Sequence, residues 1–219
     1  SETNPERRTK YFYTIALMFR DQIGNEEEAV NFLNVVLDND PTFLEAFQDL
    51  DTILTEKRDW KGLEKSYGKM LERIANDNSQ QARALRKLLF KNLGEVYRSR
   101  LDKPQKAIQA FRYASDMDPA DVELLEILAA LYSEHGEDPE DAIAAHRRMI
   151  AQAPVCGESY RALFEAYLAK KDIDRAWNMA AALVMFNVAN NTERPIYEEG
   201  VTQGVQHPRK AFSREQWRH

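Results

Sequence analysis

The residues most able to do chemistry are four histidines and one cysteine, and their spacing argues against a catalytic or metal site. The histidines are His135, His146, His207 and His219, and the cysteine is Cys156. No two histidines are three or four residues apart, and no second cysteine could complete a zinc set. The sequence has no GxSxG motif and no glycine-rich phosphate loop. We therefore expect no enzyme activity, no catalytic residue, no metal and no cofactor.

Two of these residues have their own local context. Cys156 precedes Gly157 at the start of a predicted helix, where a thiol can be activated. No histidine lies near it in sequence, so a structural role as a small buried side chain is favoured. His135 stands just before Gly136, which predicts the end of a helix there.

The composition is that of an ordinary globular protein. The chain has 219 residues, of which 43% are hydrophobic, and a formal net charge of −6. A chain of this length can bury a substantial core, and one cysteine excludes a disulfide within it. No apolar run reaches the roughly 18 residues that cross a bilayer, and residues 1–10 lack a signal-peptide core. We expect a cytoplasmic protein without a membrane segment.

An internal repeat of 35 residues is the strongest pattern in the sequence. Three tyrosines mark it, at Tyr97, Tyr132 and Tyr167. Nine or ten residues after each tyrosine stands an alanine, at Ala107, Ala142 and Ala176. Such a period predicts a stack of repeated helical units.

Each unit has the pattern of two helices. The first helix of the third unit carries apolar residues three and four apart, at Leu85, Leu88, Leu89, Leu93 and Val96. The second helix repeats the pattern at Ala107, Ile108, Phe111 and Ala114. Pro104 suits the start of that second helix, and Gly94 suits a close crossing of the two. The unit is therefore a helix–turn–helix.

This unit resembles the tetratricopeptide repeat, a helix–turn–helix of 34 residues. The residues of the third unit that match are Phe90, Leu93, Gly94, Tyr97, Ala107, Phe111, Ala114 and Pro119. In the fourth unit His146 replaces the second-helix aromatic, so a packed imidazole is favoured over a ligand or acid–base role. The resemblance covers roughly residues 9–189. It implies an all-α, right-handed superhelix of about five antiparallel helix pairs.

The units differ along the chain. Residues 1–75 hold two degenerate repeats, residues 76–86 an extended junction, and residues 87–190 three repeats. In the junction, residues 76–79 predict a turn with Ser79 as N-cap, and the next helix runs to about Arg100. Residues 191–219 show no sustained period and predict an irregular tail or the start of a following segment. Because a terminal capping helix is not evident, we expect the chain to be part of a longer protein.

The resemblance also implies a partner site, on the concave face made by the first helix of each pair. Carried over to this sequence, the site comprises Tyr13, Gln48, Lys91, Glu95, Arg98, Glu123, Glu126, Arg161 and Glu165. Ser133, Glu134 and Glu158 are exposed on the same face. The expected function is a protein–protein interaction scaffold that binds a peptide or a partner domain.

The family's clamp for the C-terminal carboxylate of chaperone tails is not expected here. Lys91 and Arg98 would suit it, but Glu123 and Glu126 stand where the next repeat should supply amides or cations. These carboxylates would repel the carboxylate of the peptide.

Charge is segregated between neighbouring units. Residues 83–103 hold seven cations and two carboxylates, a net of +5, and residues 116–141 hold ten carboxylates and no lysine or arginine. One interpretation is attraction between adjacent repeats or solvated faces. The other is a groove for a peptide of mixed or basic charge. Nucleic acid is an unlikely partner, because the cations do not share one helix face and phosphates would meet the acidic unit.

Two further functions stay open. The chain could associate with itself through its last repeat and Trp217, forming a homo-oligomer. It could also be an accessory domain of an enzyme or regulator whose catalytic part lies outside this sequence.

Overall fold

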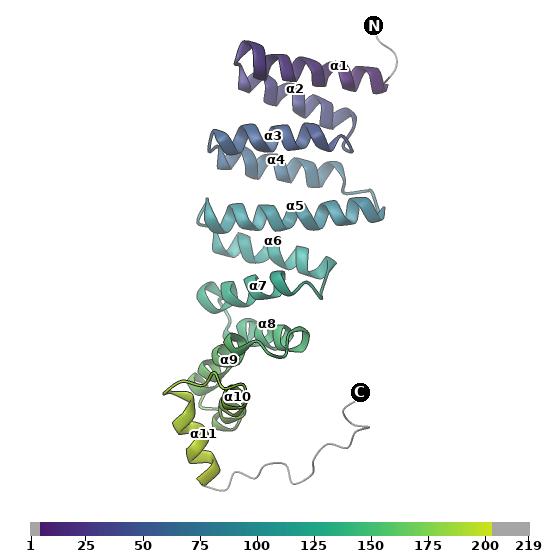
Figure 1. Ribbon diagram of the computed structural model, residues 1–219. Helices are drawn as coiled ribbons and strands as arrows, with labels where there is room; N and C mark the ends of the chain where they lie inside the picture. The colour runs from purple at the N-terminus through teal and green to yellow at the C-terminus, as the bar shows by residue number, and fades with distance from the viewer. Residues whose placement is uncertain (1–4, 203–219) are drawn as a thin grey trace. The chain divides into compact units, whose positions relative to one another are not determined.

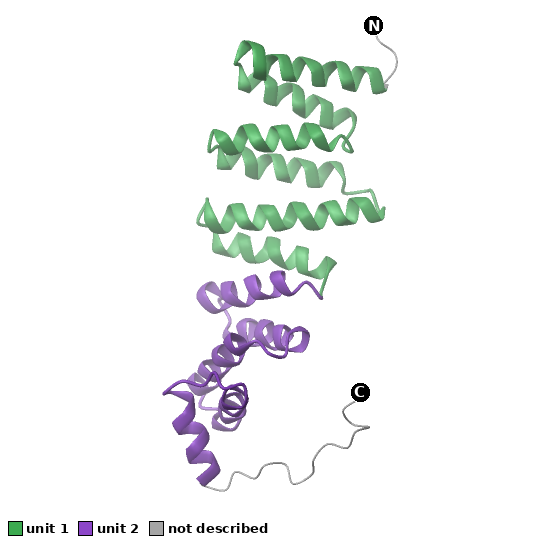
Figure 2. Ribbon diagram, in the orientation of Figure 1, with its two compact units in different colours: residues 1–119 green, residues 120–219 purple. Residues whose placement is uncertain are grey.

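The computed structural model describes residues 5–202, and helices dominate this range (Figure 1). The chain divides into two compact units, residues 1–119 (unit 1) and residues 120–219 (unit 2) (Figure 2). The helices of unit 1 are α1 (Pro5–Met18), the π-helix η1 (Phe19–Ile23), α2 (Glu26–Asn39), α3 (Leu44–Glu56), α4 (Trp60–Arg73), α5 (Gln80–Ser99) and α6 (Pro104–Met117). Those of unit 2 are α7 (Val122–His135), α8 (Pro139–Gln152), α9 (Gly157–Ala169), α10 (Ile173–Met185) and α11 (Glu193–Thr202).

Unit 1 is a stack of three helix pairs, α1 with α2, α3 with α4, and α5 with α6. Each pair also contacts the next one along the chain, through α2 and α3 and through α4 and α5. A continuous core runs between them, with Leu33, Leu50, Met70 and Leu89 almost fully buried. The apolar spacing of three and four buries Leu89, Leu93 and Val96 of α5, as predicted, but leaves Leu88 of the same pattern 53% exposed.

Helix α5 begins at Gln80, inside the predicted junction at 76–86, with Ser79 as the predicted N-cap. It has 20 residues, and the side chain of Ser79 caps its first turn by accepting a hydrogen bond from the amide of Ala82. Pro104 stands in the first turn of α6. Gly94 lies against the ring of Phe111, and a Cβ at residue 94 would come within 2.9 Å of that ring. Glycine is therefore required by the close crossing of α5 and α6.

Unit 2 contains two pairs, α7 with α8 and α9 with α10, followed by α11. Its core includes Ile143, Phe164, Tyr167 and Ala180, with Ile196 of α11 packed against it. Helix α7 ends at His135, before Gly136, as predicted. In the residues that the structure describes, the architecture is thus a helical-repeat stack without strands.

One expectation about the organisation is corrected. The irregular tail predicted from residue 191 is wrong for residues 193–202, which form α11. This helix is held by packing, because Gly200 lets it approach the indole of Trp177 and Tyr197 stacks on that indole with 5.7 Å between ring centroids. The boundary between the compact units lies after Pro119, and α4 and α5 pack on each other within unit 1.

Candidate functional site

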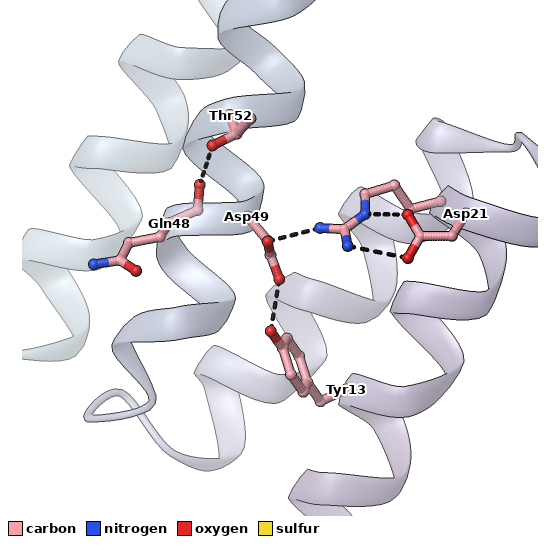
Figure 3. A network of polar contacts seen from close by, with 6 residues as sticks. Tyr13, Asp21, Gln48, Asp49 and Thr52 are labelled. Atoms are coloured by element: carbon pink, nitrogen blue, oxygen red, sulfur yellow. Dashed lines mark hydrogen bonds and ion pairs between the residues drawn. The ribbon is translucent and has the colours of Figure 1, made fainter.

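In unit 1 the first predicted site residue, Tyr13, belongs to a polar network that joins α1 and η1 to α3 (Figure 3). The hydroxyl of Tyr13 donates to Asp49 at 2.7 Å, and Arg20 donates to the other oxygen of Asp49 at 2.7 Å. Arg20 also pairs with Asp21 at 2.6 Å. Burial and the bond to Asp49 raise the pKa of Tyr13 to about 12. Tyr13 therefore already has an intramolecular partner.

Gln48 has a different position, beside a hollow of about 320 Å³ lined by α3, α4 and α5. Its amide extends away from Tyr13 and Asp49 (Figure 3) and is exposed. Leu44 and Leu88 border the same hollow and are 41% and 53% exposed. This hollow therefore presents apolar side chains and an amide together.

The three predicted site residues on α5 are exposed or half-buried. Glu95 and Arg98 pair with each other at 2.8 Å, three residues apart on the helix. Lys91 is half-buried one turn before Glu95. Earlier on the same helix, Lys87 pairs with Asp118 at 2.7 Å. The basic stretch is thus partly neutralised inside unit 1.

The end of the basic stretch is bound to Glu64 of α4. The hydroxyl of Tyr97 donates to Glu64 at 3.0 Å, and Lys103 and Lys106 donate to the same carboxylate at 2.9 and 3.1 Å. Burial acts to raise the pKa of Glu64, but these three hydrogen bonds outweigh it and lower the pKa to about 2. Attraction between adjacent repeats therefore accounts for part of the charge pattern.

In unit 2, Arg161 of α9 is bound to the start of α11. Its Nε donates to Glu193 at 2.9 Å, and its Nη2 donates to the carbonyl of Val188 at 2.9 Å. Glu193 is 1% exposed, and its second oxygen accepts from the amide of Asn190 at 2.5 Å. Arg161, a predicted site residue, therefore binds the start of α11 to α9.

Two further carboxylates of the predicted site, Glu126 and Glu165, lie beside two cavities of about 280 Å³ each among α7, α8 and α9. Glu126 lines the first and Glu165 the second, and His146 borders both. The imidazole hydrogen-bonds Ser133 at 2.9 Å through Nε2 and Ser159 at 3.1 Å through Nδ1. His146 is 9% exposed, and burial lowers its pKa. The predicted packed imidazole is confirmed.

The polar groups around His146 do not form a recognisable catalytic set. A nucleophile–histidine pair needs a third group, usually a carboxylate, to orient the imidazole. Here both ring nitrogens face serines, and Cys156 contacts Ser159 at 3.5 Å. Within residues 5–202 no cluster of histidine, cysteine and carboxylate side chains could hold a metal ion. In the same range no helix is long and apolar enough to cross a membrane.

The structure distributes the predicted site over both units. Tyr13, Gln48, Lys91, Glu95 and Arg98 lie in unit 1, and Glu123, Glu126, Arg161 and Glu165 lie in unit 2. Glu123 is exposed on α7 and is not among the residues that line the two cavities. Trp217, proposed for self-association, lies outside the described residues.

Sequence reasoning missed Asp49, Ser159 and Glu193. The first two carry no pattern of their own, because their partners are distant in sequence. Glu193 did carry a signal, since Asn190 followed three residues later by Glu is the pattern of a capping box. The structure has both of its bonds, from the amide of Glu193 to the Asn190 side chain and from the amide of Asn190 to Glu193.

Comparisons with known proteins give the fold a name. No protein-family model matches the sequence, and no curated protein is similar enough to match it. Among solved structures, the chain is similar to YrrB, described as a TPR protein with an unusual peptide-binding site, at 16% identity and a TM-score of 0.50, over 86% of this chain and 90% of that one. It is similar to the C-terminal part of a TPR repeat-containing protein from Cytophaga hutchinsonii at 15% identity and a TM-score of 0.50, over 86% and 72%.

A third similar structure is Naa15/Naa10 bound to HypK-THB, at 13% identity and a TM-score of 0.55. That match covers 88% of this chain but 29% of the other. All three identities are low, so these likenesses concern the fold alone. Together with the helix pairs and the 35-residue repeat, they show that the chain has the tetratricopeptide-repeat fold.

Proposed function

We propose that this chain is a protein-interaction scaffold that binds an extended peptide along the first helices of its pairs. The observation that carries the proposal is the hollow among α3, α4 and α5, which we call the α3–α5 groove. Its volume of about 320 Å³ falls at the lower end of ligand-site volumes. The proposed occupant is a peptide segment with an apolar side chain.

The chemistry of the α3–α5 groove supports that occupant. Leu44 and Leu88 leave much of their apolar surface in water, although a buried position would stabilise each by about 1.5–3 kcal/mol. Phe47 and Leu89 provide an apolar floor. An apolar side chain of a peptide would cover the two exposed leucines.

Polar groups of the α3–α5 groove suit the backbone of an extended peptide. The side-chain amide of Gln48 is exposed and has no hydrogen-bond partner within residues 5–202. Asn92 donates to the hydroxyl of Tyr67 at 3.4 Å, which leaves its carbonyl oxygen available. An amide offers both donors and acceptors, so it can pair with a peptide group of the partner.

The similar structures support an interaction role in general terms. YrrB is described as having a peptide-binding site, and Naa15/Naa10 is described as bound to HypK-THB. For this chain we propose a partner of mixed or basic charge rather than a carboxylate terminus, because Glu123 and Glu126 are exposed on α7.

A random peptide library displayed on phage and selected against the whole chain tests this function. Selected peptides should carry an apolar residue, and Leu88→Ser should weaken their binding by about tenfold, measured by fluorescence anisotropy. Leu88 is exposed, so the substitution should leave the circular dichroism spectrum and Tm unchanged.

Ile23→Ser is the matched control, because Ile23 is also exposed in unit 1, at 61%, and does not line the α3–α5 groove. If the two variants bind the selected peptides equally, the α3–α5 groove is not the site. If no peptide is selected, the proposed function is wrong for short linear partners.

A further inference from the structure

The two cavities beside His146 in unit 2 have walls of one charge sign. The first is lined by three carboxylates, those of Glu126, Glu134 and Glu158, and the second by Glu165. No lysine or arginine lines either cavity. We call this surface of α7, α8 and α9 the acidic groove.

Three of these carboxylates are available to a partner. Glu126, Glu158 and Glu165 are exposed, and within residues 5–202 none of them has an ion-pair partner. Glu134 contacts His135 at 3.6 Å and keeps 70% of its side chain exposed. Carboxylates that face a shared hollow repel one another until a cation lies between them.

Neither His146 nor Arg161 adds a compensating positive charge to the acidic groove. His146 is held between Ser133 and Ser159, and burial lowers its pKa, so it is neutral near pH 7. Arg161, the one cation within α9, pairs with Glu193 at 2.9 Å. The side chains that line the groove therefore carry net negative charge.

The floor of the acidic groove suits an aliphatic stem. Ala129, Ala130 and Ala162 line the first cavity between the carboxylates. Lysine and arginine bury their methylene stems on apolar surface and keep the charged end at a polar rim. A divalent metal ion is a poorer occupant, because no described cluster has the geometry to hold one.

From this combination we infer that the acidic groove binds a lysine or arginine side chain of an extended peptide partner. The inference rests on the proposed function in assuming a peptide, but it names a second site, in unit 2, with its own recognition chemistry. The α3–α5 groove would take an apolar side chain, and the acidic groove a cationic one. Charge complementarity then selects the partner at the acidic groove.

A pair of peptides that differ in one charge tests the inference on the whole chain. Both are nine residues of glycine and serine with blocked ends, one with a central arginine and one with a central citrulline, its neutral isostere. Binding is followed by ¹H–¹⁵N NMR at low salt through the backbone amides of Ser133, Cys156 and Ala162. The arginine peptide should bind about fivefold more tightly, as expected for two or three partly exposed charge pairs.

The double variant Glu126→Gln and Glu158→Gln should abolish the preference for arginine while keeping side-chain volume. The control is the double variant Glu137→Gln and Glu198→Gln, which changes the net charge equally at two exposed residues of unit 2 that do not line the acidic groove. The control should keep the preference. Equal binding of the two peptides to the wild type, or loss of the preference in the control, would overturn the inference.

Absence of amide shifts with either peptide at millimolar concentration would overturn it as well. A wrong assignment of the α3–α5 groove as the peptide site would give a different result. In that case Leu88→Ser leaves the binding of phage-selected peptides intact, whereas the arginine preference and its loss in the Glu126 and Glu158 double variant are still observed.

Discussion

At the scale of single residues, His146 links two pairs of helices through two serines, each 13 residues away along the chain. Its ring reaches Ser133 on α7 and Ser159 on α9, and it borders both cavities of the acidic groove. The repeat pattern has an aromatic residue at this position, and the histidine that replaces it is buried as well. Burial keeps the imidazole neutral because the charged form would lose its hydration.

A pH dependence of stability follows from that burial. The folded-state pKa of His146 lies below its ordinary value of 6.5, so the unfolded chain takes up the proton first. Stability from this group is complete above about pH 6.5 and falls as the pH drops through the folded-state pKa. Urea unfolding at about pH 7.5 and about pH 5 should therefore show a larger loss for the wild type than for His146→Gln. Equal losses of stability in the two proteins would mean that folding does not lower the pKa of His146.

At the scale of helices, contacts of side chains with helices far along the chain decide how the elements fit. Gly94 allows α5 to meet Phe111 of α6, and Gly200 allows α11 to meet Trp177 of α10. In α11, the buried carboxylate of Glu193 joins the helix start to Arg161 of α9. These close contacts set the positions of α6 against α5 and of α11 against α9 and α10.

Gly94→Ala should destabilise unit 1. Its new Cβ would lie 2.9 Å from the Phe111 ring, and overpacking of this kind lowers the free energy of unfolding by about 1–3 kcal/mol. Gly68→Ala is the control on α4, where no atom lies within 4 Å of the new Cβ. That variant should gain stability, because alanine favours a helix over glycine. Denaturant unfolding of both measures the difference, and an unchanged Gly94 variant would contradict the close crossing.

Glu193→Ala should release α11. It leaves Arg161 without its carboxylate and removes one half of the capping box, and we expect a loss of about 2 kcal/mol. Limited proteolysis should then cut within residues 190–202 faster than in the wild type. Glu198→Ala, at an exposed position of the same helix, should not change the rate. Equal protection of the two variants would show that Glu193 does not hold the helix.

At the scale of the whole molecule, repeat proteins unfold through neighbouring units rather than as one block. The Asp49 network joins the first pair of helices to the second, while α9 packs on α8 and α10, and α10 on α11, in unit 2. A change in the network should therefore act locally. This locality is what allows the two proposed grooves to be tested one at a time.

Asp49→Asn tests that locality by hydrogen exchange. The substitution removes the negative charge of the carboxylate to which Tyr13 and Arg20 both donate. Hydrogen bonds to a charged group of this kind are expected to slow amide exchange roughly tenfold. Amides of α1 and α2 should exchange about tenfold faster, while those of α9–α11 keep their rates. Asp116→Asn, at an exposed position, should change neither. A uniform increase over all helices would contradict nearest-neighbour coupling.

The sequence by itself determined the repeat, the helix pairs and several helix ends. The 35-residue spacing of Tyr97, Tyr132 and Tyr167, the cap at Ser79 and the proline at Pro104 act within one or two turns, so they are legible along the chain. The right-handed superhelix stays a prediction. Only the tertiary structure decided which polar side chains are paired over long distances in the sequence. Asp49 lies 36 residues from its partner Tyr13, and Glu193 lies 32 residues from its partner Arg161.

The same distinction applies to the candidate site. The resemblance implied that Glu126, Arg161 and Glu165 lie on the concave face, and Arg161 and Glu165 share a helix face because they are four residues apart. It could not tell which of them was already paired. Folding brought Glu193 to Arg161 and left Glu126 and Glu165 facing open cavities, since a pair forms wherever packing brings opposite charges together, whatever their separation along the chain.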